Sequence, residues 1–212
     1  LSKSFKVITV DRRGHGRSHD NGQPFHYATM ADEMAAFLDH LRLESVNMLG
    51  FSDGGVVGLH LASTHPDRVK KLAAVGANFR VDGMTAETIE FMRTQMTPEN
   101  LGVVFPEIER NYRATNPQPE NFTAFVARSN ELWMRDPYLT DEQMASIQAP
   151  VLLIVGENDA VRIEPVLEMR ALVEGAQICV LPGATHFVLG EKPGIVLPIL
   201  LDFFGGNSES SA

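Results

Sequence analysis

Apolar residues follow two alternating patterns along most of the chain. Short continuous apolar runs predict buried strands at residues 5–11, 45–51, 69–77, 149–159 and 177–183. Segments with apolar residues three or four positions apart predict helices at residues 27–41, directly after 52, at 164–173 and up to 204. Strands that alternate with helices are typical of a mostly parallel sheet with helices on both faces, so we predict an α/β fold.

The alternation stops between Asn78 and Gln148. This region holds prolines and helical segments such as "TAETIEFMRTQM" and "ENFTAFVARSNELWMR", and it shows no convincing strand pattern. We therefore predict a helical insertion, which either packs on its own apolar faces or also serves as a cap over a pocket. In the cap hypothesis, four large side chains are candidates for the pocket wall: Phe122, Phe125, Trp133 and Met134.

The predicted domain organisation follows from these boundaries. Residues 1–77 and 149–205 form the core, residues 78–148 form the helical cap, and residues 206–212 form a tail. The tail is small and polar, which predicts a frayed end.

The composition and charge of the chain argue against several classes of function. The chain has 212 residues, of which 44% are hydrophobic and 21% are charged, as expected for one globular domain with a sizeable core. A net charge of -9 argues against nucleic-acid binding, which needs clustered cations to replace the counterions around phosphates. No apolar run approaches the roughly 20 residues that span a bilayer. We therefore predict a small-molecule partner and neither a nucleic-acid nor a membrane partner.

The single cysteine indicates the cellular compartment in which the protein works. Cys179 lies in the apolar run "AQICVLPG" and has no second cysteine with which to form an internal disulfide. This pattern indicates a core residue in a reducing compartment, so we predict a cytoplasmic location.

A candidate nucleophile lies at a predicted junction between strand and helix. In "LGFSDGG", Ser52 stands between Gly50 and Gly54. A sharp turn there would hold the serine in a strained backbone conformation with its hydroxyl exposed, and side chains at the two glycines would collide across the bend. The amides and the positive dipole end of the following helix would stabilise an oxyanion.

A serine needs a base to become a nucleophile, and the base needs a group that orients it. Asp159 ends one predicted strand, and His186 lies in the loop after the next one. The order of nucleophile, acid and histidine, each after a separate strand, is the order that the strand-turn-helix motif predicts. Glu157 is an alternative acid. Taken singly, Asp159 could also be a turn or helix-capping residue, and His186 could be a loop histidine.

The other histidines are assigned no chemistry. His15 and Arg13, in "DRRGHGRS", are interpreted as turn and packing residues. The five that remain lack partners at metal-ligand spacing and are interpreted as surface or packing residues: His19, His26, His40, His60 and His65. No metal site is predicted.

Four stretches, "VITVDRRGHGRS", "LGFSDGG", "LLIVGENDAV" and "LPGATHFV", resemble those of the α/β-hydrolase family in their order and spacing. The similarity runs from about Phe5 to Phe204. It implies an α/β-hydrolase fold with a helical cap, in which Ser52 is the nucleophile, Asp159 the triad acid and His186 the base. It also implies that no metal or organic cofactor is needed.

Asp53, directly after the candidate nucleophile, is a candidate for contact with the substrate. In the family that the sequence resembles, the backbone N–H after the nucleophile is an oxyanion donor, which implies this role for Asp53. Its carboxylate either complements the helix N-terminus or faces the pocket and pairs with a substrate ammonium group. The pair "SDGG" and "VGAN" is similar to valacyclovir hydrolase-type members, which cleave amino-acid esters. Asp53, together with Trp133 from the predicted cap, is a candidate substrate-binding residue.

The resemblance also implies a strand that this sequence lacks. In the family, the loop with the second oxyanion donor follows an earlier strand, which lies in space between "KVITV" and "VNMLG". Without that strand, its two neighbours would face a gap lined by unpaired backbone groups. We therefore expect the sequence to be the N-terminally incomplete part of a longer protein, with the second oxyanion donor missing.

Three functions are compatible with these patterns. The first is a serine hydrolase that cleaves small carboxylic esters, with amino-acid esters as one candidate class, through an acyl-enzyme. The second is a carbon-carbon bond hydrolase or an acyl transferase with the same triad, since a fold does not fix a reaction. The third is a noncatalytic protein that binds a small ligand. The complete set of Ser52, Asp159 and His186 favours an enzyme.

Overall fold

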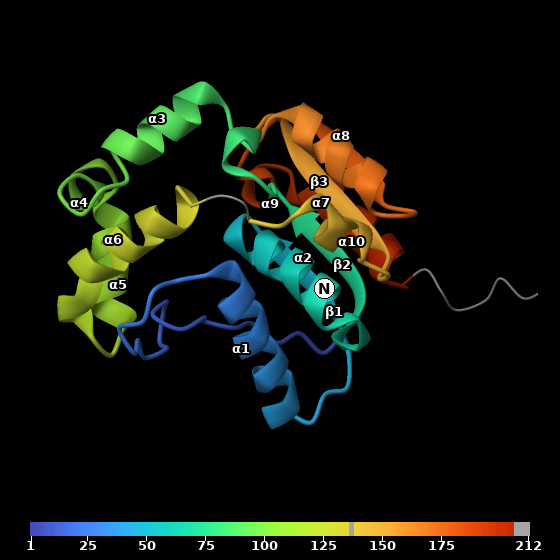
Figure 1. Ribbon diagram of the computed structural model, residues 1–212, viewed down its shortest axis with the longest axis horizontal. Helices are drawn as coiled ribbons and strands as arrows, with labels where there is room; N and C mark the ends of the chain where they lie inside the picture. The colour runs from blue at the N-terminus through green and yellow to red at the C-terminus, as the bar shows by residue number, and fades with distance from the viewer. Residues whose placement is uncertain (136–137, 206–212) are drawn as a thin grey trace, which may run out of the picture.

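A parallel sheet forms the centre of the fold (Figure 1). The computed structural model describes residues 1–135 and 138–205, and in it four strands pair in parallel in the order β1-β2-β3-β4. The strands are β1 (Val46–Phe51), β2 (Val69–Val75), β3 (Val151–Asn158) and β4 (Gln177–Thr185). Four of the five predicted strands are thereby confirmed. The predicted tail, residues 206–212, lies outside the described residues.

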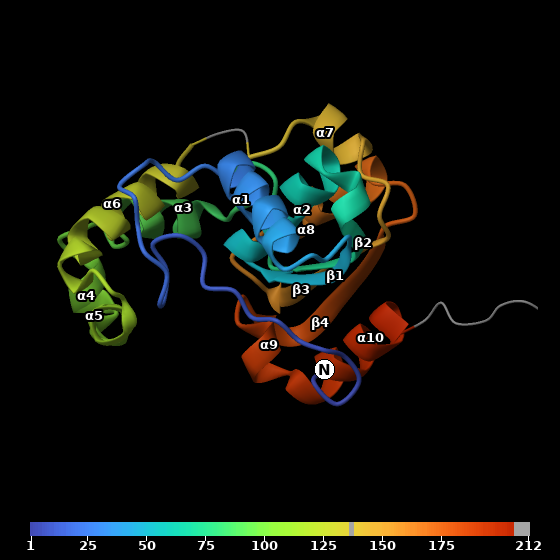
Figure 2. The ribbon, with the colours of Figure 1, turned by 90° about the horizontal axis from the view of Figure 1, so that it is seen from below.

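Helices cover both faces of the sheet, as predicted. The helices of the core are α1 (Tyr27–His40), α2 (Asp53–Thr64), η1 (Pro66–Arg68), α8 (Ile163–Leu172), α9 (Val188–Glu191) and α10 (Pro193–Gly205). Figure 2 shows α1, α2 and α8 on one face of the sheet and α9 and α10 on the other. None of the helices that the structure describes is long and apolar enough to cross a membrane.

The alternation of side chains along β3 divides the core into two parts. Leu153 and Val155 pack in the hydrophobic cluster under α1, α2 and α8, whereas Leu152 and Ile154 pack in the cluster under α9 and α10. Successive residues of a strand point to opposite faces, so a strand with helices on both sides buries all of its side chains. This burial explains why the first five residues of β3, 151–155, form a continuous apolar run.

The elements described between β2 and β3 are all helices. They are η2 (Val81–Gly83), α3 (Ala86–Thr94), α4 (Leu101–Val104), α5 (Pro106–Thr115), η3 (Pro119–Asn121), α6 (Phe122–Trp133) and α7 (Asp141–Ala145). In Figure 1, α3 to α6 form a separate group to the left of the sheet. Leu101, Tyr112, Phe122 and Val126 form a small apolar cluster within this group, so Phe122 is a core residue of the group rather than a pocket wall.

Helix α7 lies apart from that group, although it falls within the predicted cap at residues 78–148. It packs against α2, where the hydroxyl groups of Ser63 and Ser146 lie 3.0 Å apart. The chain has therefore returned to the core before β3 begins.

The predicted strand at residues 5–11 is wrong. This segment pairs with no strand in the described structure, and Val7, Ile8 and Val10 are 46%, 41% and 39% exposed. An apolar run becomes a strand only where a neighbouring strand accepts its backbone hydrogen bonds, and the sheet ends at β1. Phe5 anchors the segment instead, since its ring centroid lies 6.3 Å from that of Phe204.

A cavity of about 610 Å³ separates this segment from β1. Its walls include Val7 and Ile8 on one side and Met48 and Leu49 on the other. The unpaired edge of β1 therefore borders the cavity, at the place where the resemblance puts a further strand.

We expect His60 to make the fold sensitive to acid. His60 lies in α2, is 3% exposed, and its Nε2 lies 2.5 Å from the carbonyl oxygen of Tyr138. Burial lowers the pKa of His60, although the bond to Tyr138 acts in the opposite direction. The folded state therefore binds fewer protons than the unfolded state. Its stability should decrease as the pH falls from about 6.5 through the lowered pKa of the folded state.

Urea unfolding between about pH 7 and pH 5 measures this dependence. His60→Gln should remove a slope of at most roughly 1.4 kcal/mol per pH unit, the limit for one proton. His40→Gln, at an exposed position of α1, is the matched control and should keep the wild-type slope. An unchanged slope in His60→Gln would contradict the prediction.

Candidate active site

The turn at Ser52 is as sharp as the sequence predicts. Ser52 joins β1 to α2 with a φ of 52° and a ψ of -120°. A positive φ costs a residue with a side chain about 1–3 kcal/mol and persists only where its surroundings hold it. The Ser52 N–H donates to the Val75 carbonyl at 2.8 Å, and the Gly55 and Val56 N–H groups donate to the Ser52 carbonyl. These bonds fix Ser52 at the edge of the sheet.

The glycines around the turn differ in the space that they have. A Cβ at Gly50 would overlap the Gly54 carbonyl and would lie 2.6 Å from the Gly55 nitrogen, so this position requires glycine. A Cβ at Gly54 would meet no heavy atom within 4 Å, because Gly54 borders the cavity beside β1. The predicted collision is therefore correct for Gly50 and wrong for Gly54. The second tight position is Gly55, where a Cβ would lie 2.7 Å from the Cβ of Ala77.

The structure brings Ser52, Asp159 and His186 together at one edge of the sheet. They follow β1, β3 and β4, and the carboxyl ends of parallel strands meet at one edge. His186 Nδ1 lies 2.7 Å from Asp159 Oδ1, and His186 Nε2 lies 3.0 Å from Ser52 Oγ. Because an ionised carboxylate only accepts hydrogen bonds, the Nδ1–H donates to Asp159. This leaves Nε2 free to accept the hydrogen bond of the Ser52 hydroxyl.

Backbone donors hold Asp159 in place. Its side chain is 0% exposed and accepts hydrogen bonds from the N–H groups of Gly156 at 3.2 Å and Val161 at 3.1 Å. A buried carboxylate needs such donors to replace water. The alternative acid, Glu157, instead accepts a hydrogen bond from the Gly183 N–H at 2.8 Å. The geometry thus favours Asp159 as the partner of the imidazole.

Gly76 is a residue of this site that the sequence interpretation missed. It follows β2 with a φ of 58°, and a Cβ there would lie 2.9 Å from both Cε1 and Nδ1 of His186. The ring centroid of Phe51 lies 5.0 Å from that of the same imidazole. The available signal was the glycine in "VGAN", directly after an apolar strand. Glycine at this position leaves room for the imidazole.

The start of α2 supplies a backbone donor. Asp53 is the first residue of the helix, and its N–H has no acceptor among the residues that the structure describes. The first amides of a helix are unpaired within it and carry the positive end of its dipole. This N–H is therefore suited to an oxyanion formed at the neighbouring Ser52.

The side chains of Asp53 and Trp133 contact each other. Trp133 Nε1 lies 3.1 Å from each carboxylate oxygen of Asp53, and the Tyr27 hydroxyl donates to Oδ1 at 2.7 Å. The Arg12 guanidinium lies 3.7 Å from Oδ2. Both predicted substrate-binding residues thus have partners within the protein. The sequence interpretation missed Tyr27 and Arg12, because nothing in their local pattern indicates a contact with residue 53.

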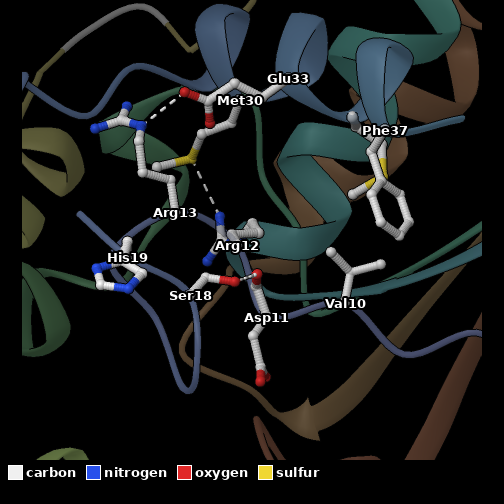
Figure 3. Close-up of a pocket in the computed structure, with 10 residues that line it drawn as sticks. Val10, Asp11, Arg12, Arg13, Ser18, His19, Met30, Glu33 and Phe37 are labelled. Carbon is white, nitrogen blue, oxygen red and sulfur yellow. Dashed lines mark hydrogen bonds and ion pairs between the residues drawn. The ribbon is translucent and has the colours of Figure 1, made fainter. Parts of the chain in front are cut away.

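Arg12 borders a cavity of about 350 Å³ between residues 10–19 and α1 (Figure 3). Figure 3 shows its guanidinium directed toward Met30, whose sulfur lies 3.2 Å from Nη1. In the same view, Arg13 pairs with Glu33 at 2.6 Å. The three residues that meet at the edge of the sheet do not line this cavity. The space in Figure 3 is therefore separate from the serine hydroxyl.

His15 lies where a packing residue is expected. Its ring centroid lies 4.9 Å from that of Phe125 in an edge-on arrangement. Burial, followed by the nearby Arg12 charge, lowers the pKa of His15, which favours the neutral imidazole. In the described part of the chain, no group of His, Cys, Asp and Glu is arranged to hold a metal ion.

Known proteins are similar to this chain in sequence and in fold. The sequence model described as alpha/beta hydrolase fold matches residues 1–136. A candidate carbamate hydrolase, RutD of Azorhizobium caulinodans, is 26% identical over 97% of this chain and 83% of that protein. The 2-hydroxy-6-oxo-2,4-heptadienoate hydrolase of Pseudomonas putida is 28% identical over 96% of this chain and 79% of that protein.

A solved structure supports the same fold. A variant of the meta-cleavage product hydrolase CumD from Pseudomonas fluorescens matches with a TM-score of 0.78 at 22% sequence identity. The match covers 98% of this chain and 82% of that chain. The predicted fold class, a mostly parallel sheet flanked by helices, is therefore confirmed.

We expect alanine at Gly50 and at Gly54 to have different effects. Gly50→Ala places a Cβ against the backbone of the turn and should destabilise the protein by about 2 kcal/mol or more. Gly54→Ala meets open space in a helix and should change stability by less than about 1 kcal/mol, in the stabilising direction. Urea midpoints of both variants test this difference. Similar losses in both would show that the turn does not depend on the space at Gly50.

Proposed function

The chain belongs to the alpha/beta hydrolase fold family and is a hydrolase, and from this premise we propose that it cleaves small carboxylic esters through an acyl-enzyme on Ser52. One observation carries the proposal: Ser52 Oγ lies 3.0 Å from His186 Nε2, and His186 Nδ1 lies 2.7 Å from Asp159 Oδ1. A serine hydroxyl is a weak nucleophile at neutral pH. This arrangement supplies the base and the orienting acid that it needs.

Acylation begins when His186 Nε2 takes the proton of the Ser52 hydroxyl and Oγ attacks the acyl carbon. The carbonyl oxygen becomes an oxyanion, which the Asp53 N–H and the positive end of α2 stabilise. As the tetrahedral intermediate collapses, the imidazolium gives its proton to the leaving alkoxide, and the alcohol departs. Asp159 stabilises the imidazolium through Nδ1–H and remains ionised throughout.

Deacylation repeats these steps with water as the nucleophile. His186 takes a proton from water, and the resulting hydroxide oxygen attacks the acyl carbon of the ester on Ser52. Collapse of the second tetrahedral intermediate returns the proton to Ser52 Oγ and releases the carboxylic acid. The fixed position of the imidazole lets one group act as base and acid in both halves of the reaction.

The proposal includes a small-molecule partner and no cofactor. Ser52, His186 and the Asp53 N–H supply nucleophile, base and oxyanion donor, so the reaction as written needs neither a metal nor an organic group. Residues 78–148 are the proposed cap over the substrate. The proposal also includes a cytoplasmic location, which is supported by the presence of a single cysteine, Cys179, that can form no internal disulfide.

Carbon-carbon bond hydrolysis is the second candidate. It is supported by the 28% identity, over 96% of this chain, with a 2-hydroxy-6-oxo-2,4-heptadienoate hydrolase. The 26% identity with a candidate carbamate hydrolase supports cleavage of acyl-heteroatom bonds instead. An acyl-enzyme intercepted by an alcohol rather than by water would give acyl transfer from the same site.

Hydrolysis of a short-chain 4-nitrophenyl ester should depend on the three residues at the sheet edge. We expect Ser52→Ala to lower kcat by roughly 10⁶-fold and Asp159→Asn by roughly 10⁴-fold, because the second variant no longer fixes the imidazole tautomer. Glu157→Gln is the matched control and should keep wild-type kcat, since Glu157 bonds to the Gly183 N–H. Release of nitrophenolate measures all three. A larger loss in Glu157→Gln than in Asp159→Asn would assign the acid role to Glu157.

A substrate panel distinguishes the two reactions. We expect short-chain esters to be turned over with a kcat/KM at least about tenfold above that for vinylogous diketone acids, because the proposal assigns the site to ester substrates. Absorbance of the dienoate and titration of released acid measure the two activities. The reverse ratio would favour carbon-carbon cleavage. Binding without turnover of either class would support the noncatalytic alternative and contradict an enzyme.

A further inference from the structure

The side chain of Asp53 joins three helices. Asp53 opens α2, its Oδ1 accepts the hydroxyl hydrogen bond of Tyr27 in α1 at 2.7 Å, and Trp133 Nε1 at the end of α6 lies 3.1 Å from both oxygens. We call Tyr27, Asp53 and Trp133 the Asp53 clasp. The clasp ties the last helix of the group α3 to α6 to the residue that follows the proposed nucleophile.

Trp133 is held at a second point. The Tyr138 hydroxyl donates to the Trp133 carbonyl, and the Tyr138 N–H donates to the Phe79 carbonyl, beyond β2, at 3.2 Å. His60 Nε2 in α2 lies 2.5 Å from the Tyr138 carbonyl oxygen. The end of α6 is therefore fixed to the core both through the clasp and through the returning chain.

The residue that the clasp holds also carries the proposed oxyanion donor. In the proposed function the Asp53 N–H is the oxyanion donor, and it belongs to the peptide that follows Ser52 at a φ of 52°. With the carboxylate bonded to α1 and α6, rotation of this peptide would break hydrogen bonds at the other end of the residue. Catalytic donors need such support, because small misplacements are costly in rate.

The surroundings of Asp53 argue against recognition of a substrate amine. Both carboxylate oxygens face donors of the protein, and the Arg12 guanidinium lies 3.7 Å from Oδ2. An ammonium group would compete with Tyr27 and Trp133 for the carboxylate oxygens and would approach a cation of like charge. Burial, and then the Asp53 charge, raise the pKa of Tyr27 well above its usual value, so its hydroxyl remains a donor.

We propose that Asp53 is a positioning residue, whose clasp couples the docking of α6 to the geometry of the Ser52–Asp53 peptide. Esters with neutral and with cationic acyl groups then depend on it alike. The catalytic part rests on the proposed function, whereas the contact between Asp53 and Trp133 is measurable without activity.

Trp133 is the only tryptophan of the chain, so its fluorescence reports on the clasp directly. We expect Asp53→Asn to shift the emission to longer wavelength and to raise the acrylamide quenching constant, because the weakened contact lets the end of α6 move and exposes the indole to water. Tyr27→Phe, which keeps the carboxylate, should give a smaller change in the same direction. Asp67→Asn, at an exposed position in η1, is the matched control and should give none. Unchanged emission and quenching in Asp53→Asn would overturn the clasp.

Kinetics test positioning against amine recognition. The substrates are the alanine and propionate esters of one alcohol, which differ in the ammonium group. We expect Asp53→Asn to lower kcat by about tenfold on both esters, the effect of one well-placed hydrogen bond. Trp133→Phe, which keeps an aromatic ring without the N–H, should give a similar loss. A rise in KM confined to the alanine ester would overturn positioning and assign Asp53 to the substrate amine.

Ser52→Ala keeps the two proposals distinguishable. Retained turnover in that variant would remove the proposed function, while the fluorescence comparison would still decide the clasp. Loss of turnover in Ser52→Ala together with unchanged fluorescence in Asp53→Asn would remove the clasp alone. If Asp53→Asn does not unfold cooperatively on heating, Tyr27→Phe and Trp133→Phe decide the outcome by fluorescence and kcat respectively.

Discussion

Ser52 is held at a positive φ between β1 and α2, and the rest of the site is arranged around this bend. The conformation costs about 1–3 kcal/mol, and it persists because strand pairing and helix packing fix both of its ends. Val75 accepts the Ser52 N–H from the neighbouring strand, and Gly50 leaves room for the first turn of α2. The result is a hydroxyl that meets an imidazole and an N–H that stays unpaired among the described residues.

The parallel sheet then supplies the remaining groups. Ser52 and His186 lie 134 positions apart in the sequence, and Asp159 lies 27 positions from His186. They meet because β1, β3 and β4 point the same way and end at one edge. Between them, β2 contributes Gly76, whose missing side chain provides the space in which the imidazole lies. The relatives differ in the reactions that their names state, which fits a scaffold that fixes Ser52, Asp159 and His186 more firmly than it fixes the choice of substrate.

The same edge of the sheet contacts the helices inserted after β2, which are the proposed cap. That contact is polar at its centre, where the carboxylate of Asp53 bonds to Tyr27 and Trp133. A carboxylate that is only 21% exposed, with several donors and a nearby guanidinium, is costly to leave unpaired. The arrangement therefore favours one docked position of α6 over a loosely attached one.

The sequence predicted those features that arise from local patterns. Apolar periodicity indicated the four strands and the helices around them, and the glycine-serine turn with a later Asp and His indicated the groups that converge. The sequence alone could predict that these groups converge, because residues that directly follow parallel strands lie at the same edge of the sheet. Residues 5–11 show its limit, because an apolar run needs a neighbouring strand to become one. Gly54 and Asp53 show the same limit. The open space beside Gly54 depends on packing between distant segments. The partners of Asp53, Tyr27 and Trp133, lie 26 and 80 positions away in the sequence. Such packing is set by the docking of whole elements, which no short stretch of sequence encodes.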